Sequence, residues 1–273
     1  MPEAPAGAAA RRIEEAFDAG GKSAALMPYL MGGFPSLEES LEVGRVYARH
    51  ADLVEIGVPF SDPLADGPAI QAAGHRALGA GATLERVLDE VAAPLAETLP
   101  VVLMCYSNPI VRRGFEPVAR ALAEREVGGL IVPDMPAAEA RELRDACDRC
   151  GVALVPLVAP TTTGDDLQAI VAAARGFVYV VSVTGVTGER RELPPRLARV
   201  VDDVRAQGST PAAVGFGIGT PAQAALVGEI ADGVIIGSRL VRELAESETF
   251  DAGLEGIDRF LAATAAALRE GGS

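Results

Sequence analysis

The chain has 273 residues, and 49% of them are hydrophobic, which is enough to build the core of one larger α/β domain. It carries 38 acidic against 24 basic residues, and the net charge of -14 opposes binding to nucleic acid or to an anionic membrane. Small molecules and other proteins remain as partners.

The amino-terminal segment carries no targeting pattern. Residues 1–10 are rich in Ala and Pro and lack the basic start and apolar core of a signal peptide. We therefore expect a cytoplasmic protein. Residues 1–10 are predicted as a disordered tail, and residues 11–273 as a single domain that opens with a helix.

Short apolar runs of strand length recur along the chain, separated by segments with helix signals. Ser36-Leu-Glu-Glu39 predicts a capping box, Thr220-Pro221 a cap and first turn, and Pro194-Pro195 precedes another helical run. After the second run, residues 68–80 and 83–99 predict two extra helical pieces over the strand ends. The predicted strands are residues 25–30, 52–58, 101–105, 129–132, 153–158, 177–182, 212–215 and 233–236.

This alternation predicts parallel strands joined by crossover helices. Eight repeats in roughly 250 residues are typical of a (β/α)8 TIM barrel. A doubly wound open sheet is the alternative, but no G-x-G-x-x-G motif follows the first strand, where Gly32-Gly33-Phe-Pro35 indicates a turn.

In such a barrel the active site lies at the carboxyl ends of the strands. Lys22, His50 and the Cys147-x-x-Cys150 pair fall at the opposite face. The residues predicted around the mouth are Tyr29, Glu55, Asp62, Asp66, Tyr106, Ser107, Asn108, Asp134, Val158, Tyr179, 185–188, Gly217, Gly237 and Ser238.

Glu55 lies within a predicted buried strand, and Asp62 and Asp66 lie on the loop that follows it. Burial without a partner raises the pKa of a carboxyl group toward neutrality, where the group can both give and take protons. The alternative is that Glu55 forms an ion pair inside the barrel and that the two aspartates are ordinary turn residues beside Pro63 and Gly67.

Glycine-rich turns follow the last three predicted strands, at residues 184–188, 215–219 and 237–238. Loops after the last two strands, with a following helix N-terminus, form the usual phosphate site of a barrel, and Thr220-Pro221 and Ser238 mark helix starts there. Tyr29, Tyr106 and Tyr179 fall at strand ends and could wall a flat apolar ligand, although core packing is the alternative for each. Together these features predict a substrate with a phosphate at one end and a flat ring at the other.

Several chemistries are excluded. Lys22 is the only lysine, and it precedes the first strand, so no Schiff-base lysine is available in the pocket. No metal site is expected, because the two histidines have no ligand spacing to another His or Cys. The Cys147 and Cys150 pair ends a charged helical segment and is predicted to be structural.

From Arg11 to the end, the chain resembles the tryptophan synthase alpha chain family. The motifs that carry the resemblance are E-I-G-V-P-F-S-D-P-L-A-D-G-P at 55 to 68, Y-S-N-P at 106 to 109, P-D-M-P at 133 to 136, F-V-Y-V-V-S-V-T-G-V-T-G at 177 to 188, G-F-G-I at 215 to 218 and D-G-V-I-I-G-S at 232 to 238. The resemblance implies an aldolase-type barrel that splits indole-3-glycerol phosphate into indole and glyceraldehyde 3-phosphate. It also implies a heterotetramer with a beta chain that carries pyridoxal phosphate, and no cofactor in this chain.

The resemblance also assigns residues. Glu55 corresponds to the general acid and base, and Asp66 to the second catalytic carboxylate that holds the ring N–H. Thr187 corresponds to a loop threonine that closes over the substrate, and the loop at residues 185–192 is predicted to be mobile without ligand. By the same correspondence the ring pocket is lined by Tyr29, Tyr106, Val158 and Tyr179, the phosphate is bound by Gly188, Gly217, Gly237 and Ser238, and the beta chain is met by Asp62, Pro63, Asn108 and Pro109.

Three alternatives remain open from the sequence. The same residues would serve a stand-alone lyase that releases free indole. A non-catalytic subunit that only activates its partner is a second alternative, which the intact Glu55 and Asp66 pair argues against. A phosphosugar isomerase on the same barrel is the third, and it would leave the aromatic pocket without a purpose.

Overall fold

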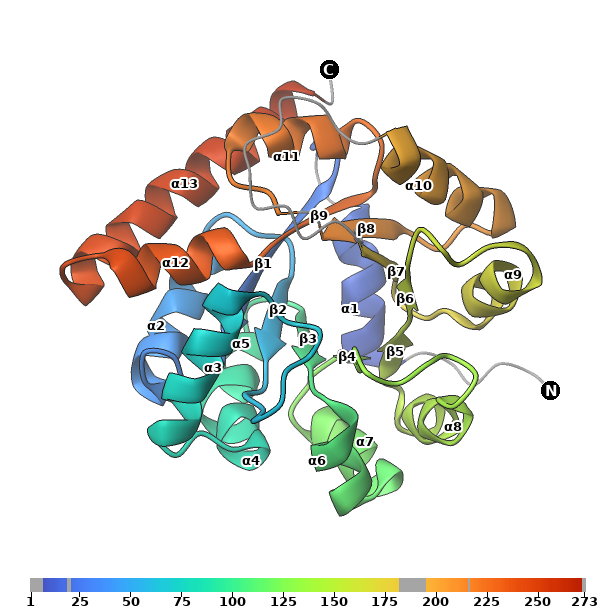
Figure 1. The fold of residues 1–273 in the computed structure, drawn as a ribbon, viewed down its shortest axis with the longest axis horizontal. Helices are drawn as coiled ribbons and strands as arrows, with labels where there is room; N and C mark the ends of the chain where they lie inside the picture. Colours follow the sequence, from blue (N-terminus) through green and yellow to red (C-terminus); the bar gives the residue numbers. More distant parts are fainter. Residues whose placement is uncertain (1–6, 19–20, 182–194, 216, 272–273) are drawn as a thin grey trace.

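The computed structural model describes residues 7–18, 21–181, 195–215 and 217–271. Its centre is one curved sheet of parallel strands, surrounded by helices (Figure 1). Neighbouring strands follow the order β5-β4-β3-β2-β1-β9-β8-β7-β6. The strands are β1 (Ala25–Met31), β2 (Val54–Gly57), β3 (Val101–Met104), β4 (Gly129–Ile131), β5 (Ala153–Val155), β6 (Leu157–Val158), β7 (Val178–Val181), β8 (Ala212–Gly215) and β9 (Gly233–Ile236).

All eight predicted strands are present, and the fifth is divided into β5 and β6 at Pro156. Proline has no N–H to give to a strand ladder, which accounts for the break. The Pro156 carbonyl still accepts a hydrogen bond from the Tyr179 N–H at 2.9 Å. Because β5 and β6 stand at the two ends of the strand order, this one chain segment closes the sheet. The predicted (β/α)8 barrel is confirmed.

Helices cover the outside of the barrel, and the predicted extra structure after β2 is α3 and the run from α4 to α5 (Figure 1). The Ser36 hydroxyl accepts from the Glu39 N–H, and Thr220 and Gln223 form a full capping box. The helices are α1 (Ala8–Phe17), α2 (Leu37–Tyr47), α3 (Pro68–Gly79), α4 (Leu84–Val87), a π-helical turn (Leu88–Ala92), α5 (Ala93–Ala96), α6 (Ser107–Arg113), α7 (Phe115–Glu124), α8 (Arg141–Cys150), α9 (Gly164–Ala173), α10 (Pro195–Gln207), α11 (Pro221–Gly228), α12 (Ser238–Glu246) and α13 (Phe250–Glu270).

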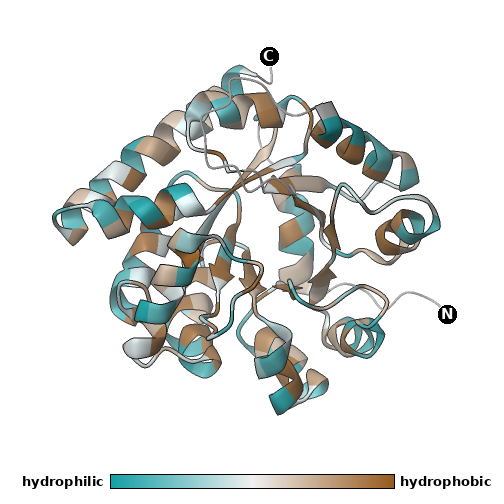
Figure 2. Ribbon diagram, viewed as in Figure 1, coloured by the Kyte–Doolittle hydropathy of each residue, from teal (hydrophilic) through white to brown (hydrophobic). Residues whose placement is uncertain are grey.

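Two apolar layers hold the fold together. The larger layer lies between the strands and the surrounding helices, and apolar residues concentrate there and on the strands (Figure 2). The smaller layer fills the barrel interior, where Met27, Leu53 and Phe177 meet Ile13 of α1. Helix α1 therefore closes the amino-terminal end of the barrel. It begins at Ala8, so the last three residues of the segment predicted as a tail belong to a helix.

The closed end of the barrel carries the groups that were predicted to be structural. Lys22 Nζ lies 2.8 Å from both carboxylate oxygens of Asp52, which also accepts the Leu26 N–H. Cys147 is buried and unpaired, and burial raises the pKa of its thiol to about 12, which supports the structural reading of the cysteine pair.

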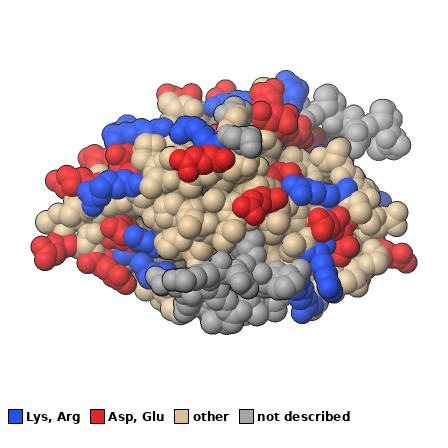
Figure 3. All heavy atoms as spheres, turned by 90° about the horizontal axis from the view of Figure 1, so that it is seen from above, with Lys and Arg blue, Asp and Glu red and all other residues tan. Residues whose placement is uncertain are grey.

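The outer surface of the described residues mixes both signs of charge. Acidic and basic side chains alternate around a central area of uncharged residues on the face in Figure 3. No helix in the described part of the chain is long and apolar enough to cross a membrane.

Candidate active site

The inward-facing positions of the barrel change from apolar to polar along each strand. Side chains alternate between the two faces of a strand, so residues two apart share a face. Met27 is followed on the inner face by Tyr29, and Leu53 by Glu55. Tyr29 and Glu55 pair directly in the ladder between β1 and β2. The polar inner positions therefore gather at the carboxyl ends of the strands, where the site was predicted.

Glu55 is the centre of this polar layer. Its side chain is buried with only 1% exposure, and neither carboxylate oxygen has a hydrogen-bond partner among the described residues. Burial, followed by the negative charge of Asp66, raises the pKa of Glu55 from 4.5 to about 8. The alternative of an ion pair inside the barrel is therefore not what the described residues form. A carboxyl group in this state holds a proton near neutral pH and can release it.

Asp66 stands on the loop between β2 and α3, and its side chain is half-buried. Burial raises the pKa of this carboxyl group to about 6, against a hydrogen bond from Tyr106 that lowers it. The Asp66 N–H donates to the Pro63 carbonyl at 3.1 Å, so the loop is a tight turn. Its pKa leaves Asp66 ionised at the pH where Glu55 is still protonated.

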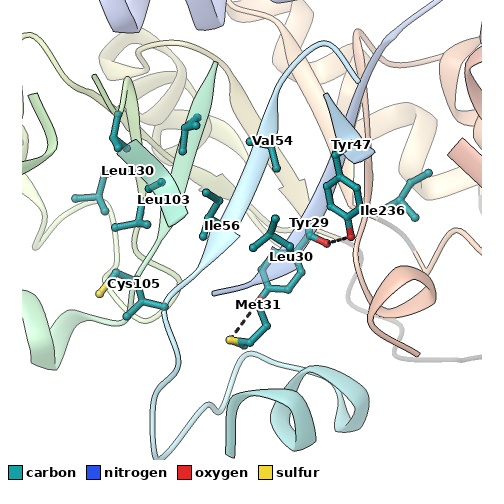
Figure 4. Packing of buried hydrophobic residues seen from close by; sticks show 14 of the residues in the cluster. Tyr29, Leu30, Met31, Tyr47, Val54, Ile56, Leu103, Cys105, Leu130 and Ile236 are labelled. Atoms are coloured by element: carbon teal, nitrogen blue, oxygen red, sulfur yellow. Dashed lines mark hydrogen bonds between the residues drawn. The ribbon is translucent and has the colours of Figure 1, made fainter. Parts of the chain in front are cut away.

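The rings of two tyrosines pack against glycines of the neighbouring strand, near the carboxyl ends of the strands. A Cβ atom on Gly57 would lie 2.0 Å from the Tyr29 hydroxyl, and one on Gly215 would lie 2.5 Å from the Tyr179 hydroxyl. Only glycine at these positions leaves room for the rings. Figure 4 shows the Tyr29 side chain beside Met31. The Tyr47 hydroxyl donates to the backbone carbonyl of Tyr29 at 3.1 Å. Burial raises the pKa of both tyrosine hydroxyls well above the ordinary value, so they remain protonated.

Tyr106 lies between the end of β3 and α6 and contacts the Asp66 loop. Its ring stacks on Phe60, with ring centroids 4.9 Å apart and an interplanar angle of 21°. Its hydroxyl accepts the Ala65 N–H at 3.1 Å. The structure therefore brings Tyr106 together with the Asp66 loop, and the predicted place of its ring in the pocket wall stays a prediction.

Val158 does not share the inner face with the tyrosines. It pairs in register with Val180, whereas its neighbour Leu157 pairs with Tyr179. Leu157 packs against the interior cluster, as does its pairing partner Tyr179. By the alternation along a strand, Leu157 faces the barrel interior. This register favours Leu157 over Val158 for the ring pocket, because the alternation continues from Val155 through Pro156 to Leu157 without a shift.

The predicted phosphate loops lie beside this layer where the structure describes them. Gly217 has φ of +34°, a conformation that favours glycine. Gly237 is the N-cap of α12, and Ser238 is the first residue of that helix. A Cβ on Gly67 would lie 3.8 Å from the Ser238 hydroxyl oxygen, so the loop with Asp66 adjoins the start of α12. Thr187, Gly188 and the predicted mobile loop at 185–192 lie outside the described residues.

The four residues predicted to meet a partner lie on two neighbouring surface segments. Asp62 and Asn108 are exposed, Pro109 is half-exposed, and Pro63 is buried. Asp134, which the sequence placed at the mouth, binds the start of α6. Its two oxygens accept the Ser107 N–H at 2.8 Å and the Ser107 hydroxyl at 2.7 Å.

Three residues contribute to the site without having been predicted from the sequence. Gly57 and Gly215 make room for the tyrosine rings, and the signal that could have found them is a glycine two residues after an inward-facing position. Gln71 donates from its side-chain amide to the carbonyls of Pro63 at 3.2 Å and Asp66 at 2.8 Å. A lone glutamine in the first turn of a helix gives no such signal in the sequence.

The whole chain compares well with known proteins of one family. The family model described as "Tryptophan synthase alpha chain" matches residues 17–266. The tryptophan synthase alpha chain of Carboxydothermus hydrogenoformans is 49% identical over 219 residues, which cover 80% of this chain and 82% of the relative.

Solved structures agree with this comparison. A structure of Mycobacterium tuberculosis tryptophan synthase superimposes with a TM-score of 0.84 at 35% identity, and the match covers 95% of this chain and 98% of that one. The tryptophan synthase subunit alpha of Legionella pneumophila matches with a TM-score of 0.85 at 32% identity, with the same coverage of 95% and 98%. The chain therefore belongs to the tryptophan synthase alpha chain family.

Proposed function

We propose that this chain cleaves indole-3-glycerol phosphate into indole and glyceraldehyde 3-phosphate, with Glu55 as its general acid and base. The observation that carries the proposal is the state of Glu55, a buried carboxyl group with no hydrogen-bond partner among the described residues. A group that is dry and unpaired costs stability, and this cost is typical of a functional site.

The two carboxyl groups suit two different roles because their pKa values are pushed apart. At neutral pH Glu55, with a pKa of about 8, holds the proton that C3 of the indole ring must receive. The resulting carboxylate then takes the proton of the adjacent glycerol hydroxyl. As that oxygen becomes a carbonyl, the carbon–carbon bond breaks and its electrons return to the protonated ring. Glu55 regains its proton in the same step.

Asp66 supplies the negative charge that the reaction needs. With a pKa of about 6 it is mostly ionised at neutral pH. As a carboxylate it accepts the ring N–H and stabilises the positive charge that develops on the ring when C3 is protonated. The phosphate end of the substrate would lie at Gly188, Gly217, Gly237 and Ser238. Of these, Gly237 and Ser238 stand at the start of α12, and a helix N-terminus favours an anion.

An assay of indole release from indole-3-glycerol phosphate tests the proposal, run with and without the cognate beta chain. Release that rises with the beta chain supports a synthase subunit. Equal release in both conditions would favour the stand-alone lyase. Absence of release in both, with the beta chain still activated, would favour the non-catalytic subunit.

Asp66→Asn is expected to lower kcat by about 10²–10³-fold while KM changes little, because the lost interaction is made with charge that develops only in the transition state. Steady-state kinetics over a range of substrate concentrations measure this. A large rise in KM with kcat unchanged would show that Asp66 only binds the ground state.

A surface of exposed apolar residues supports a beta chain as partner. Leu64 is 94% exposed and Val111 is 58% exposed, and these are the large hydrophobic residues that stand out on the described surface. Leu64 follows Asp62 and Pro63, and Val111 follows Asn108 and Pro109. Two exposed large apolar side chains beside all four predicted contact residues fit a protein interface there, although one such side chain alone would be ordinary. We propose that this surface meets a beta chain that carries pyridoxal phosphate, in a cytoplasmic heterotetramer, and that this chain uses no cofactor of its own.

Leu64→Asp is expected to weaken beta-chain binding by at least about tenfold, because a charge in the apolar centre of an interface loses its hydration. Isothermal titration calorimetry measures the Kd. Ala266→Asp is the matched control, since it adds the same charge to an exposed position on α13, a helix on the other side of the barrel from α6 (Figure 1). Equal affinities of Leu64→Asp and the wild type would remove Leu64 from the interface.

A further inference from the structure

The loop that carries Asp66 has little support of its own. It runs from the end of β2 at Gly57 to the start of α3 at Pro68 and contains no helix or strand. Leu64, two residues before Asp66, is 94% exposed. Inside the loop the Leu64 N–H donates to the Asp62 carbonyl at 3.0 Å, and the Asp66 N–H donates to the Pro63 carbonyl at 3.1 Å. A carboxylate that must face one ring atom of a substrate needs more than this turn to hold it in place.

Side chains from two helices on either side of the loop provide that support. Gln71 of α3 binds the loop backbone at the Pro63 and Asp66 carbonyls. Tyr106, at the N-cap of α6, binds the loop from the other side, because its hydroxyl accepts the Ala65 N–H at 3.1 Å. The stacking of Tyr106 on Phe60 fixes the plane of its ring.

The Tyr106 hydroxyl can serve Asp66 at the same time. A phenol has one proton to donate and lone pairs to accept with. Since the Ala65 N–H occupies an acceptor position, the proton is left for the adjacent Asp66 carboxylate. Burial, followed by the charge of Asp66, raises the pKa of the Tyr106 hydroxyl, so it stays a donor over the working pH range.

We propose that Tyr106 is a positioning residue for Asp66, whose single hydroxyl group fixes the loop backbone at Ala65 and orients the Asp66 carboxylate toward the substrate. The inference rests on the proposed function for the role of Asp66. It differs from the pocket-wall reading of Tyr106, which needs only the aromatic ring. A hydrogen bond from Tyr106 lowers the pKa of Asp66, so losing the hydroxyl should make Asp66 harder to ionise.

Tyr106→Phe tests the proposal, because it removes the hydroxyl and keeps the ring. The acid limb of the pH profile of kcat is expected to move to higher pH. The loss in kcat should be roughly tenfold near pH 6 and smaller near pH 8, since a hydrogen bond to a charged group is typically worth about that factor or more. KM should change less than kcat. A pH profile with the wild-type acid limb, whatever the loss in kcat, would overturn the proposal.

Tyr47→Phe is the matched control. Tyr47 is buried at 1% exposure, and its hydroxyl donates a hydrogen bond to the Tyr29 carbonyl in the outer apolar layer. This variant should lose stability and leave the acid limb unmoved.

A titration that does not depend on turnover separates this inference from the proposed function. The carboxyl carbon of Asp66, followed by NMR in the substrate-free protein, should have a higher midpoint in Tyr106→Phe than in the wild type. Replacing all four tyrosines with 3-fluorotyrosine makes their hydroxyls stronger donors without changing the packing, and it should lower the same midpoint. Unchanged midpoints would sink the positioning role even if the wild type releases indole. Shifted midpoints in a chain that releases no indole would leave the positioning role standing and remove the proposed function.

Discussion

Glu55→Gln is expected to lower kcat for indole release by about 10²–10⁴-fold, the usual contribution of a general acid or base. The amide has nearly the same shape as the carboxyl group, but it can neither deliver a proton to C3 nor take one from the glycerol hydroxyl. Because both transfers depend on this one side chain, we expect a loss near the upper end of that range. KM should change little, since the ring and phosphate contacts stay in place.

Asp52→Asn is the control for this measurement. It makes the same carboxyl-to-amide change at the closed end of the barrel, where Asp52 pairs with Lys22 at 2.8 Å. That variant should be less stable and should keep the wild-type kcat. Turnover within tenfold of wild type in Glu55→Gln would mean that another group carries the proton.

The sequence was most informative about the strands, because a strand covered on both faces is a continuous apolar run that few other elements imitate. Leu26, Val54, Val101 and Val234 are fully buried members of such runs. The division of the fifth strand was visible in principle, since Pro156 stands in the middle of that run. The π-helical turn between α4 and α5 has no comparable signal in the sequence, and in the structure α2 packs against that segment.

The site divides in the same way. A glutamate inside an apolar strand is conspicuous, so Glu55 could be found from the sequence alone. The pairing of Tyr29 with Glu55 also follows once the strands are aligned. Which of Leu157 and Val158 faces inward follows from the alternation along the strand, because Val155 and Leu157 share the inner face and one residue of difference reverses the side chain. Contacts between loops, such as the Tyr106 hydroxyl on Ala65, depend on distances that no local pattern encodes.

Buried and unpaired groups at the site make the stability of this protein depend on pH. The pKa of Glu55 is raised to about 8 in the folded protein from an ordinary 4.5. The stability associated with this group is therefore fully present below the ordinary pKa of about 4.5 and is lost as the pH rises through about 8, because over that window the unfolded chain releases a proton that the folded chain retains. Asp66, whose pKa is raised from 3.8 to about 6, also lowers the stability as the pH rises, over the lower part of this pH range.

Glu55→Gln should remove most of this dependence. Between about pH 5 and about pH 8.5, the unfolding free energy of the variant is expected to rise relative to that of the wild type by on the order of 4 kcal/mol, at about 1.4 kcal/mol for each unit of pKa shift. Urea unfolding at the two pH values measures the difference. Comparing the two pH values cancels the constant cost of burying an amide, which is the same at both.

A difference in unfolding free energy between variant and wild type that does not vary with pH would mean that Glu55 is already paired in solution. It would then not be the buried, unpaired acid that the mechanism requires. An inactive variant whose unfolding free energy rises relative to that of the wild type as the pH rises would show that Glu55 lowers the stability of the folded protein at neutral pH and is kept for proton transfer.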